Sequence, residues 1–541
     1  MRAFLTLHTP RAARRYYETG VWREDTFYGL LERHAALNGG APALRDATRR
    51  LSWREVKLWV DGVAADLEAR GLVEGDRVSI WRGNAMETVI VLLACSRQGY
   101  ACNPTLHRTH TCAEVATLLK RLRSAAFFSE PGWGADRAET DLEALLDGID
   151  HLKAVEPEGR IAGPGARPRG DPVTDPDKIA YLAFTSGTTG MPKCVMHSDN
   201  TLFANARDMV DVWRIGTDTK LLSLSPLSHH IAWVGAAQWV LAGCEFITDD
   251  RPAGVDKIDW IAETGATYVM GVPTHAMDVL AEQRARGLAR IGAVEIFYMA
   301  GAPIPPVVCE AFVAQGIAPQ NIYGMTENSS HHFTHPGDDA ETVTRTCGRG
   351  GRAYEVAIFD MADPDRRVGK GVSGQIAGRG GALMLGYFAN QEATEESFNA
   401  SGWFLSGDLG SLDADGNLSI DGRLKDLIIR GGHNIYPSEI EALAIRHDAV
   451  ERVAVFPVPD ERLGERGCIA VIGGIEADSL LSHLHAEGLS RYDMPEYFIR
   501  MDAFPLTASG KILKRELVEM AKNGAIRPDP VRFDPAREAA Q

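Results

Sequence analysis

The sequence lacks the features that mark several common classes of protein. It has no run of about 18 apolar residues, the length that a membrane-spanning helix needs. Its eight cysteines form no C-x-x-C pair, which argues against a zinc site and a disulfide scaffold and favours reduced thiols. Basic residues are outnumbered 57 to 73, so the formal charge of −16 disfavours nucleic acid and anionic lipid as partners. We therefore expect no nucleic-acid partner and no membrane span.

The sequence does contain the pattern of a large α/β protein. Its 541 residues are too many for one domain of about 150 residues, and they suit one large domain with at least one smaller one. Short β-like runs alternate with helical stretches, as in Arg77–Trp81 followed by Glu87–Ala94. This alternation predicts an α/β fold with a largely parallel sheet. Because the apolar run near the start is short and arginines follow it, no secretory signal is indicated, and we expect a cytoplasmic protein.

The most informative segment is a loop rich in glycine and hydroxyl groups. It follows Ile179–Phe184, a continuous apolar run that reads as a buried strand. Backbone N–H groups, hydroxyls and one cation can surround phosphate oxygens, although a plain Ser/Thr/Gly turn is the alternative. The loop is not a Walker A motif, because its lysine follows the last glycine by three positions and no Ser or Thr comes next. Its residues are Thr185, Ser186, Gly187, Thr188, Thr189, Gly190, Met191, Pro192 and Lys193.

Further motifs follow this loop in a fixed order. They are Met299–Pro303, Tyr323–Glu327, Gly386–Tyr387 with Thr394, Gly402–Asp408, Gly422–Asp426 and Pro505–Lys511. In this combination the sequence resembles the adenylate-forming superfamily of acyl-CoA synthetases, nonribosomal peptide adenylation domains and beetle luciferases. The resemblance spans Thr26 to Leu517, nearly the whole chain.

The resemblance implies two domains within the α/β class. Residues 1–424 would form a large N-terminal domain of several subdomains with mainly parallel sheets, which binds AMP and the acyl group. Residues 425–541 would form a small mobile α+β domain. Lys425 resembles the hinge residue about which this domain swings between two faces of the large one.

The resemblance also implies a nucleotide site. Tyr323 would stack on adenine, Thr326 would hold a phosphate oxygen, and Glu327 would bind Mg²⁺, for which one carboxylate suffices beside phosphate oxygens. Asp408 would accept both ribose hydroxyls, and Arg423 would make a second contact to ribose and phosphate. Taken alone, an aspartate after glycine is usually a turn residue. Gly301, Ala302, Pro303, Gly324 and Met325 are also assigned to ATP or AMP, and Thr188 is assigned to the metal with Glu327.

The C-terminal motifs imply residues for both steps of catalysis. In the family, the lysine matching Lys511 approaches the carboxylate and the α-phosphate as charge develops in the transition state. Lys514 and Arg515 are expected to be ordinary surface residues. The segment Arg430, Gly431, Gly432 and His433 resembles the loop that lines the pantetheine tunnel for CoA. A Gly-Gly turn before a helix capped by Ser438 is compatible with that role.

The segment Pro226–Trp233 departs from the usual acyl-pocket pattern. Ser228 replaces a bulky residue, and His230 doubles the histidine. His229 resembles a gate beside the substrate carboxylate. A metal site formed by these histidines with His331 and His332 is disfavoured, because no Cys or carboxylate stands at ligand spacing. The residues assigned to the acyl pocket are His229, His230, Trp233 and Val272, with core packing as the alternative for Trp233.

Together the motifs imply an ATP-dependent carboxylate–CoA ligase that uses ATP, Mg²⁺ and CoA. No aspartate between Lys220 and Phe246 could pair with a substrate ammonium, so an amino acid is disfavoured. We expect a medium-chain, alicyclic or aromatic acid, as in cyclohexanecarboxylate–CoA ligases. The alternatives are an acyl-AMP ligase that loads a carrier protein, a luciferase-like oxygenase and a nucleotide-binding pseudoenzyme. The oligomeric state stays open, with a homodimer as one option.

Overall fold

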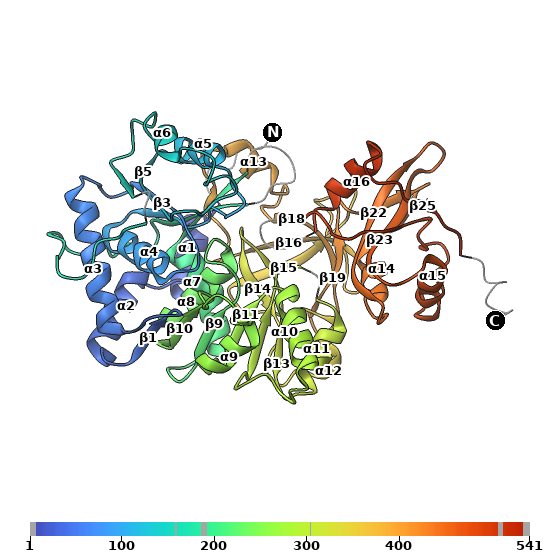
Figure 1. Cartoon of the computed structure of the whole chain (residues 1–541), viewed down its shortest axis with the longest axis horizontal. Helices are drawn as coiled ribbons and strands as arrows, with labels where there is room; N and C mark the ends of the chain where they lie inside the picture. The colour runs from blue at the N-terminus through green and yellow to red at the C-terminus, as the bar shows by residue number, and fades with distance from the viewer. Residues whose placement is uncertain (1–6, 157–158, 186–191, 303, 507–511, 534–541) are drawn as a thin grey trace.

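Two large, mostly parallel sheets form the body of the protein (Figure 1). The computed structural model describes residues 7–156, 159–185, 192–302, 304–506 and 512–533. The first sheet pairs its inner strands in parallel and has an antiparallel strand at each edge. In spatial order its strands are β14 (Ser329–Phe333), β13 (Ala318–Met325), β12 (Ile296–Met299), β11 (Tyr268–Gly271), β9 (Lys220–Ser223), β10 (Glu245–Thr248), β1 (Pro42–Arg45) and β2 (Arg50–Ser52).

The second sheet contains the apolar run that precedes the candidate phosphate loop. Its side chains alternate between two cores: Tyr181 and Ala183 pack into one, and Leu182 and Phe184 into the other. Burial on both faces explains why this strand is apolar throughout. In spatial order the strands are β17 (Gly386–Tyr387), β8 (Cys194–Ser198), β7 (Ile179–Phe184), β4 (Ala101–Asn103), β3 (Arg77–Trp81), β5 (Ser124–Ser129) and β6 (Ala154–Glu156).

Helices cover both sheets and fill the space between them. Core residues from both sheets and from α2, α3, α4, α7 and α8 form one continuous cluster, while α9, α10 and α11 cover the outer face of the first sheet and α5 and α6 that of the second. The helices of this body are α1 (Pro10–Glu18), α2 (Phe27–Asn38), α3 (Trp53–Ala69), α4 (Met86–Gln98), α5 (Cys112–Leu122), α6 (Leu142–Leu146), α7 (Asp199–Trp213), α8 (His230–Ala242), α9 (Lys257–Thr264), α10 (Pro273–Ala285), α11 (Pro306–Val313), α12 (Ala340–Arg345) and α13 (Gln391–Glu396).

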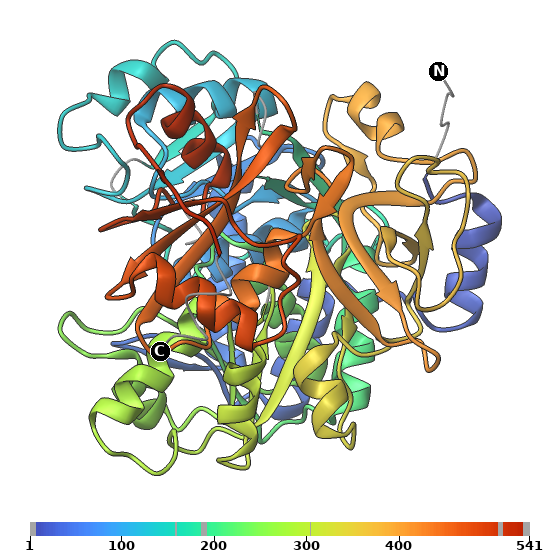
Figure 2. The same ribbon diagram turned by 90° about the vertical axis from the view of Figure 1, so that its right-hand side faces the viewer.

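Two smaller sheets follow in the chain. An antiparallel sheet contains β15 (Tyr354–Phe359), β16 (Gly374–Gly380), β18 (Phe404–Leu412) and β19 (Leu418–Arg423). The C-terminal sheet lies at one end of the molecule and faces the viewer in Figure 2. It contains β20 (Ile428–Arg430), β21 (His433–Ile435), β22 (Val450–Asp460), β23 (Gly464–Gly473), β24 (Tyr497–Arg500) and β25 (Asp529–Pro530), and its helices are α14 (Pro437–Ala444), α15 (Ala477–Ala486) and α16 (Lys514–Lys522).

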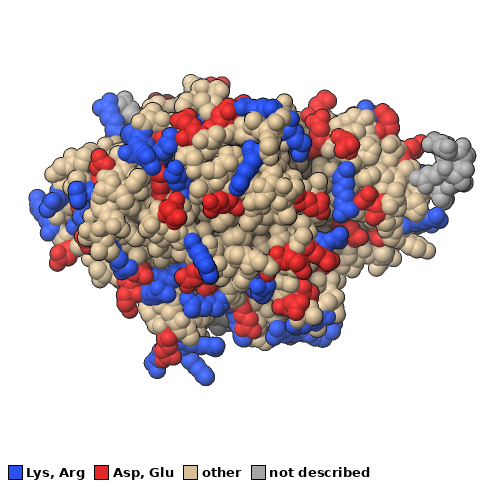
Figure 3. Space-filling view, turned by 90° about the horizontal axis from the view of Figure 1, so that it is seen from below, with Lys and Arg blue, Asp and Glu red and all other residues tan. Residues whose placement is uncertain are grey.

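The structure confirms the predicted α/β class with mostly parallel sheets and a small C-terminal unit. All eight cysteines are buried and free, as the absence of paired motifs suggested. Within the described ranges, no helix combines the length and the apolar composition that crossing a membrane requires. On the face shown in Figure 3, basic and acidic side chains are interspersed rather than gathered by sign.

Candidate functional site

The candidate site forms at the carboxyl edge of the first sheet. The strands β9, β11, β12 and β13 are parallel neighbours, so the segments that follow their carboxyl ends meet at one edge. Ligands of open α/β sheets bind at this edge. The predicted residues in the segments that follow these strands are His229 after β9, Val272 after β11, Gly301 and Ala302 after β12, and Thr326 and Glu327 after β13.

A tight hairpin between β13 and β14 presents Thr326 and Glu327. Gly324 allows the two strands to approach, because a Cβ atom there would lie 1.8 Å from the carbonyl oxygen of Ser329. Ser329 itself has a left-handed backbone with φ of 53°. Gly301 also has a positive φ, of 89°, in the loop after β12. These positions explain why two of the predicted motifs contain glycine.

Asp408, the residue predicted to bind the ribose, has polar partners on two other strands. The hydroxyl of Tyr323 donates to Asp408 Oδ2 (2.8 Å), and Arg423 Nε donates to Asp408 Oδ1 (3.0 Å). Asp408 and Arg423 stand opposite each other on β18 and β19. Asp408 is buried, whereas the Arg423 side chain is 55% exposed. The structure thus brings together three residues that are 85 and 15 positions apart in the sequence.

Glu327 forms a second cluster with Tyr387 and Lys193. The Tyr387 hydroxyl donates to Glu327 Oε1 (2.9 Å), and Lys193 Nζ lies 4.6 Å from the centre of the Tyr387 ring. Burial raises the pKa of the Glu327 carboxyl, although the Tyr387 hydrogen bond and the charges of Lys193 and Arg423 oppose this rise. A divalent cation beside Glu327 would favour its ionised form.

The residues around Glu327 fit Mg²⁺ better than a metal held by protein ligands alone. The described part of the chain contains no group of three or more His, Cys, Asp or Glu that could hold a metal. Mg²⁺ uses one or two carboxylates and completes its shell with phosphate oxygens and water, which a single half-buried glutamate satisfies. The two histidines that follow β9 contact other imidazole rings: His230 stacks on His197 (5.5 Å between ring centres), and His229 packs on His107 (4.7 Å).

The candidate phosphate loop connects the antiparallel strands β7 and β8. Its first residue, Thr185, donates its backbone N–H to the Lys193 carbonyl (2.8 Å) and so closes the base of the loop. The predicted residues Ser186, Gly187, Thr188, Thr189 and Gly190, together with Pro303 and Lys511, lie outside the described residues.

Two of the predicted acyl-pocket residues, Trp233 and Val272, are buried. Trp233 is 1% exposed, donates its indole N–H to the Leu227 carbonyl (2.7 Å) and packs near Tyr181 (6.1 Å between ring centres). It therefore packs in the core, and its role as a pocket wall stays a prediction. Val272 is buried at the start of α10.

The predicted hinge residue precedes the C-terminal sheet, and the predicted CoA residues lie in its first hairpin. Lys425 is exposed in the turn that links β19 to β20. Gly431 and Gly432, with φ of 61° and 90°, form the two-residue turn of the β20–β21 hairpin. Arg430 pairs with Glu496 (3.2 Å), and His433 Nε2 pairs with Asp493 (2.7 Å).

Two expectations about this region are wrong. Ser438 does not cap α14: the helix begins at Pro437 with Tyr436 at the cap, and the Ser438 hydroxyl donates to the Asp421 carbonyl. Lys514 is not an ordinary surface residue, because Lys514 Nζ pairs with Glu441 (2.7 Å) and joins α16 to α14. Both errors concern contacts with residues distant in the sequence.

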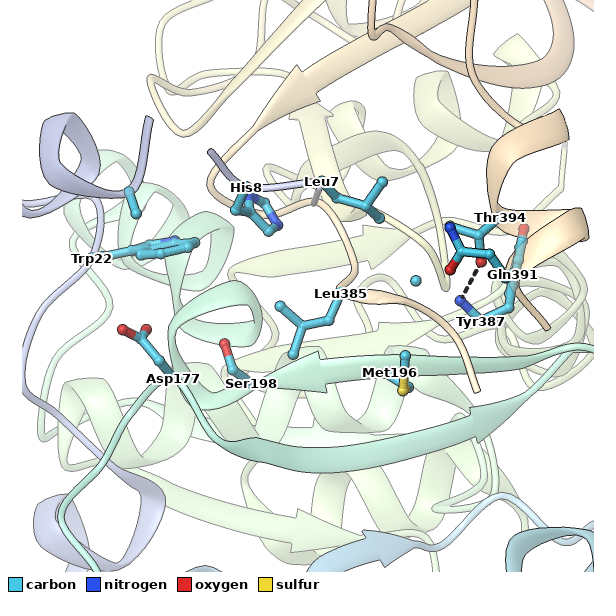
Figure 4. Close-up of a pocket in the computed structure, with 12 residues that line it drawn as sticks. Leu7, His8, Trp22, Asp177, Met196, Ser198, Leu385, Tyr387, Gln391 and Thr394 are labelled. Atoms are coloured by element: carbon cyan, nitrogen blue, oxygen red, sulfur yellow. Dashed lines mark hydrogen bonds between the residues drawn. The ribbon is translucent and has the colours of Figure 1, made fainter. Parts of the chain in front are cut away.

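A cavity of about 390 Å³ lies beside Tyr387 (Figure 4). It runs between the N-terminal segment, with His8 and Trp22, and the strands β8 and β17. The Tyr387 backbone N–H donates to Thr394 Oγ1 (3.0 Å) at one end of this cavity. None of the predicted acyl-pocket residues lines it.

Sequence reasoning missed the roles of Tyr387 and His197. Tyr387 was noted only as part of a motif, yet its hydroxyl holds Glu327. His197 Nε2 contacts the Thr326 carbonyl (2.6 Å) across 129 positions. A histidine within the β8 run carries no local signal for this contact.

Comparisons with known proteins agree with this geometry. The model of the AMP-binding enzyme family matches residues 31–388, and that of the AMP-binding enzyme C-terminal domain matches residues 439–511. A feruloyl-CoA synthase from an Amycolatopsis species is 32% identical over 494 residues, 90% of this chain and 97% of that protein. A Mycobacterium tuberculosis CoA ligase for a propanoate with a 7a-methyl-1,5-dioxo-octahydroindenyl group is 30% identical over 502 residues, 88% of this chain and 95% of that protein.

A solved structure shows the same architecture over nearly the whole chain. The crystal structure of ATP-bound MatB from Rhodopseudomonas palustris superposes with a TM-score of 0.82 at 27% sequence identity, covering 93% of this chain and 100% of that one. The family match extends over well over half of the sequence. The chain therefore belongs to the family of AMP-binding enzymes.

Proposed function

We propose that the protein activates a carboxylic acid with ATP at the carboxyl edge of the first sheet and passes the acyl group to CoA. The chain is an AMP-forming acid–thiol ligase, with ATP and CoA as substrates. One observation carries the assignment of the site: Asp408 pairs with Arg423 and accepts a hydrogen bond from Tyr323, which lies on β13 four positions before Glu327. A hydroxyl-binding carboxylate beside a metal-binding carboxylate suits a nucleotide.

In the first half-reaction, a carboxylate oxygen of the acid attacks the α-phosphorus of ATP. The bond from this phosphorus to the bridging oxygen breaks, and pyrophosphate leaves with the electron pair. Asp408, oriented by its contact with Arg423, would accept hydrogen bonds from the ribose hydroxyls, and Glu327 with Thr326 would hold Mg²⁺ and a phosphate oxygen. The ion, when bound, offsets phosphate charge. Lys511 would stabilise the charge that develops between acid and phosphate.

In the second half-reaction, the thiolate of CoA attacks the acyl carbon of acyl-AMP. The bond from that carbon to the phosphate oxygen breaks, and AMP leaves. The β20–β21 hairpin, which includes Arg430, would bind CoA after a rotation at Lys425. Its two-glycine turn, without side chains, supports passage of a thin pantetheine arm.

The acid is proposed to be a ring acid that carries an oxygen substituent. Two buried polar atoms near His229, the Tyr181 hydroxyl and His230 Nδ1, have no hydrogen-bond partner among the described residues. Their rings lie 5.6 Å apart. Buried polar groups without partners are costly, and a hydroxyl or keto oxygen of the acid would satisfy them. The dioxo-substituted acid named for the M. tuberculosis relative supports this choice.

Acid-dependent pyrophosphate release tests the proposal. The panel contains acetate, hexanoate, cyclohexanecarboxylate, benzoate and their hydroxyl- or keto-substituted forms. Each methylene missing from the acid forfeits about 0.8 kcal/mol of burial, so acetate should be a poor substrate. CoA and an acyl carrier protein are then offered to the acyl-AMP in parallel. Transfer to the carrier protein alone would favour the acyl-AMP ligase, and no pyrophosphate release with any acid would favour the pseudoenzyme.

A further inference from the structure

Two stacked imidazoles contact the turn that presents Glu327, one at each end of the turn. His197 on β8 contacts the Thr326 carbonyl through Nε2 (2.6 Å), and His230 at the start of α8 is hydrogen-bonded through Nε2 to Ser329 Oγ (2.8 Å). The two rings lie 5.5 Å apart with an interplanar angle of 21°. One imidazole therefore holds the beginning of the turn and the other holds its end.

The contacts of His197 fix its tautomer. A carbonyl oxygen only accepts, so Nε2 carries the proton and donates to Thr326, while Nδ1 lies 2.9 Å from Thr201 Oγ1. Burial lowers the pKa of His197 to about 4, so the ring stays neutral near pH 7. The donor is thus always present at Thr326 under ordinary conditions.

The turn itself needs external support. Ser329 has a φ of 53°, a left-handed conformation that is costly for a residue other than glycine. Other contacts restrain the middle of the turn: the Met384 backbone N–H donates to the Glu327 carbonyl (2.7 Å), and Asn205 donates to the Asn328 carbonyl (2.8 Å). A strained turn held at every residue is expected where side-chain position matters.

We propose that His197 and His230 are positioning residues that hold the two ends of the Thr326–Ser329 turn and thereby set the place of Glu327 during adenylation. This inference rests on the proposed role of Glu327 in the ATP site. Neither imidazole needs to touch the reacting atoms. Misplacing a reacting or metal-binding group by about 1 Å can cost about 100-fold in rate. Loss of the contacts that hold the Thr326–Ser329 turn should therefore slow adenylation.

The first test compares His197→Leu, His197→Gln and a matched control. His34→Leu removes another histidine whose Nε2 contacts a backbone carbonyl, that of Val240 (2.8 Å), and whose ring packs on an aromatic residue, Trp53 (4.6 Å). We expect His197→Leu to lower kcat of adenylation by about 10- to 100-fold. His197→Gln, which keeps an N–H donor, should recover part of the loss. His34→Leu should keep the wild-type kcat.

A second readout does not depend on turnover. Mn²⁺ binding to the full-length protein with a non-hydrolysable ATP analogue, followed by electron paramagnetic resonance, should weaken by about tenfold in His197→Leu, the loss expected for one hydrogen bond. Wild-type protein that binds Mn²⁺ and the analogue but activates no acid would refute the proposed function and leave the positioning role measurable. Unchanged kcat and Mn²⁺ affinity in His197→Leu, or equal losses in His34→Leu, would overturn the positioning role.

His230 is tested by its partner, because His230 also lies at the proposed acid site. Ser329→Gly removes the hydroxyl that His230 contacts and relieves the left-handed strain. If the contact positions the turn, this variant should be as stable as the wild type yet adenylate several-fold more slowly. Faster or equal adenylation would overturn the role of His230.

Discussion

The proposed nucleotide edge and the proposed CoA hairpin use polar residues in opposite ways. At the nucleotide edge, Asp408 and Glu327 contact Tyr323 and Tyr387, partners that lie on other strands. At the hairpin, the basic residues Arg430 and His433 pair with acidic residues of the C-terminal sheet region. The first arrangement leaves carboxylates ready for hydroxyls and a cation. The second neutralises the groups that would meet CoA phosphates.

This difference suggests that the two half-reactions need different preparation. Preorganised groups at the nucleotide edge stabilise charge without rearranging when the reaction occurs. For CoA to bind at the hairpin as proposed, Arg430 and His433 would first exchange their acidic partners for phosphate. The C-terminal unit would therefore move before thioester formation, and substitutions should separate the two steps.

Lys511→Ala should have the largest effect and should act on adenylation alone. Losing one preorganised charge typically costs about 100-fold or more in rate, and the charge of Lys511 is proposed to act only in the transition state of adenylation. Pyrophosphate release measures the first step, and thioester formation from supplied acyl-AMP measures the second. Equal losses in both steps would remove the role assigned to Lys511.

Lys425→Pro should impair the second step and spare the first. Proline fixes φ near about −65° and should block rotation in the turn between β19 and β20. We expect thioester formation to fall by about tenfold or more, since the proposed rotation at Lys425 would gate this step. Lys425→Ala is the control that leaves φ free. Single-turnover formation of acyl-AMP that fell as far as CoA transfer would place the hinge elsewhere.

Arg430→Ala should raise KM for CoA by about tenfold, the value of one charge-assisted hydrogen bond, and leave pyrophosphate release unchanged. Arg446→Ala is matched to it, because Arg446 also pairs with a glutamate of the C-terminal region, Glu487 (2.6 Å). CoA titrations at constant acyl-AMP measure both variants. The same KM for CoA in Arg430→Ala and the wild type would argue against CoA at the hairpin.

Tyr181→Phe should reduce the preference for oxygen-substituted acids by about two- to tenfold, the range of one neutral hydrogen bond. The measured quantity is the ratio of kcat/KM between a hydroxyl- or keto-substituted acid and its parent. Because the Tyr181 hydroxyl has no partner among the described residues, the variant should unfold at the same temperature or higher. Tyr100→Phe, which removes a hydroxyl bound to the Leu72 carbonyl (3.3 Å), should keep the ratio. An unchanged ratio in Tyr181→Phe would show that the oxygen substituent of the acid does not contact the Tyr181 hydroxyl.

The smallest expected effect is a shift in the acid limb of the pH dependence of the adenylation rate. Burial raises the pKa of Glu327, so protonation as the pH falls should remove its affinity for Mg²⁺ at a higher pH than for an ordinary glutamate. Because Mg²⁺ competes with the proton, raising its concentration should move the acid limb to lower pH. If the acid limb does not move with the Mg²⁺ concentration, the titration of another group causes it.

Local pattern in the sequence was sufficient for the fold class. The apolar run Ile179–Phe184 forms β7, and Arg77–Trp81 with the helix after it forms β3 and α4. Such elements are set by neighbouring residues, through hydrophobic periodicity and turn chemistry. The candidate site was placed by motifs in the same way, and its strand ends do lie at one sheet edge.

Only the tertiary structure decided which side chains meet. Tyr387 reaches Glu327 across 60 positions, and His197 reaches Thr326 across 129. Lys514 looked like a surface residue in the sequence, but packing of α16 places its ammonium beside Glu441. The sequence by itself determined the elements and the order of their motifs, because these depend on local periodicity and turn residues. The positions of the supporting groups depend on how the sheets and helices pack, which no local pattern encodes.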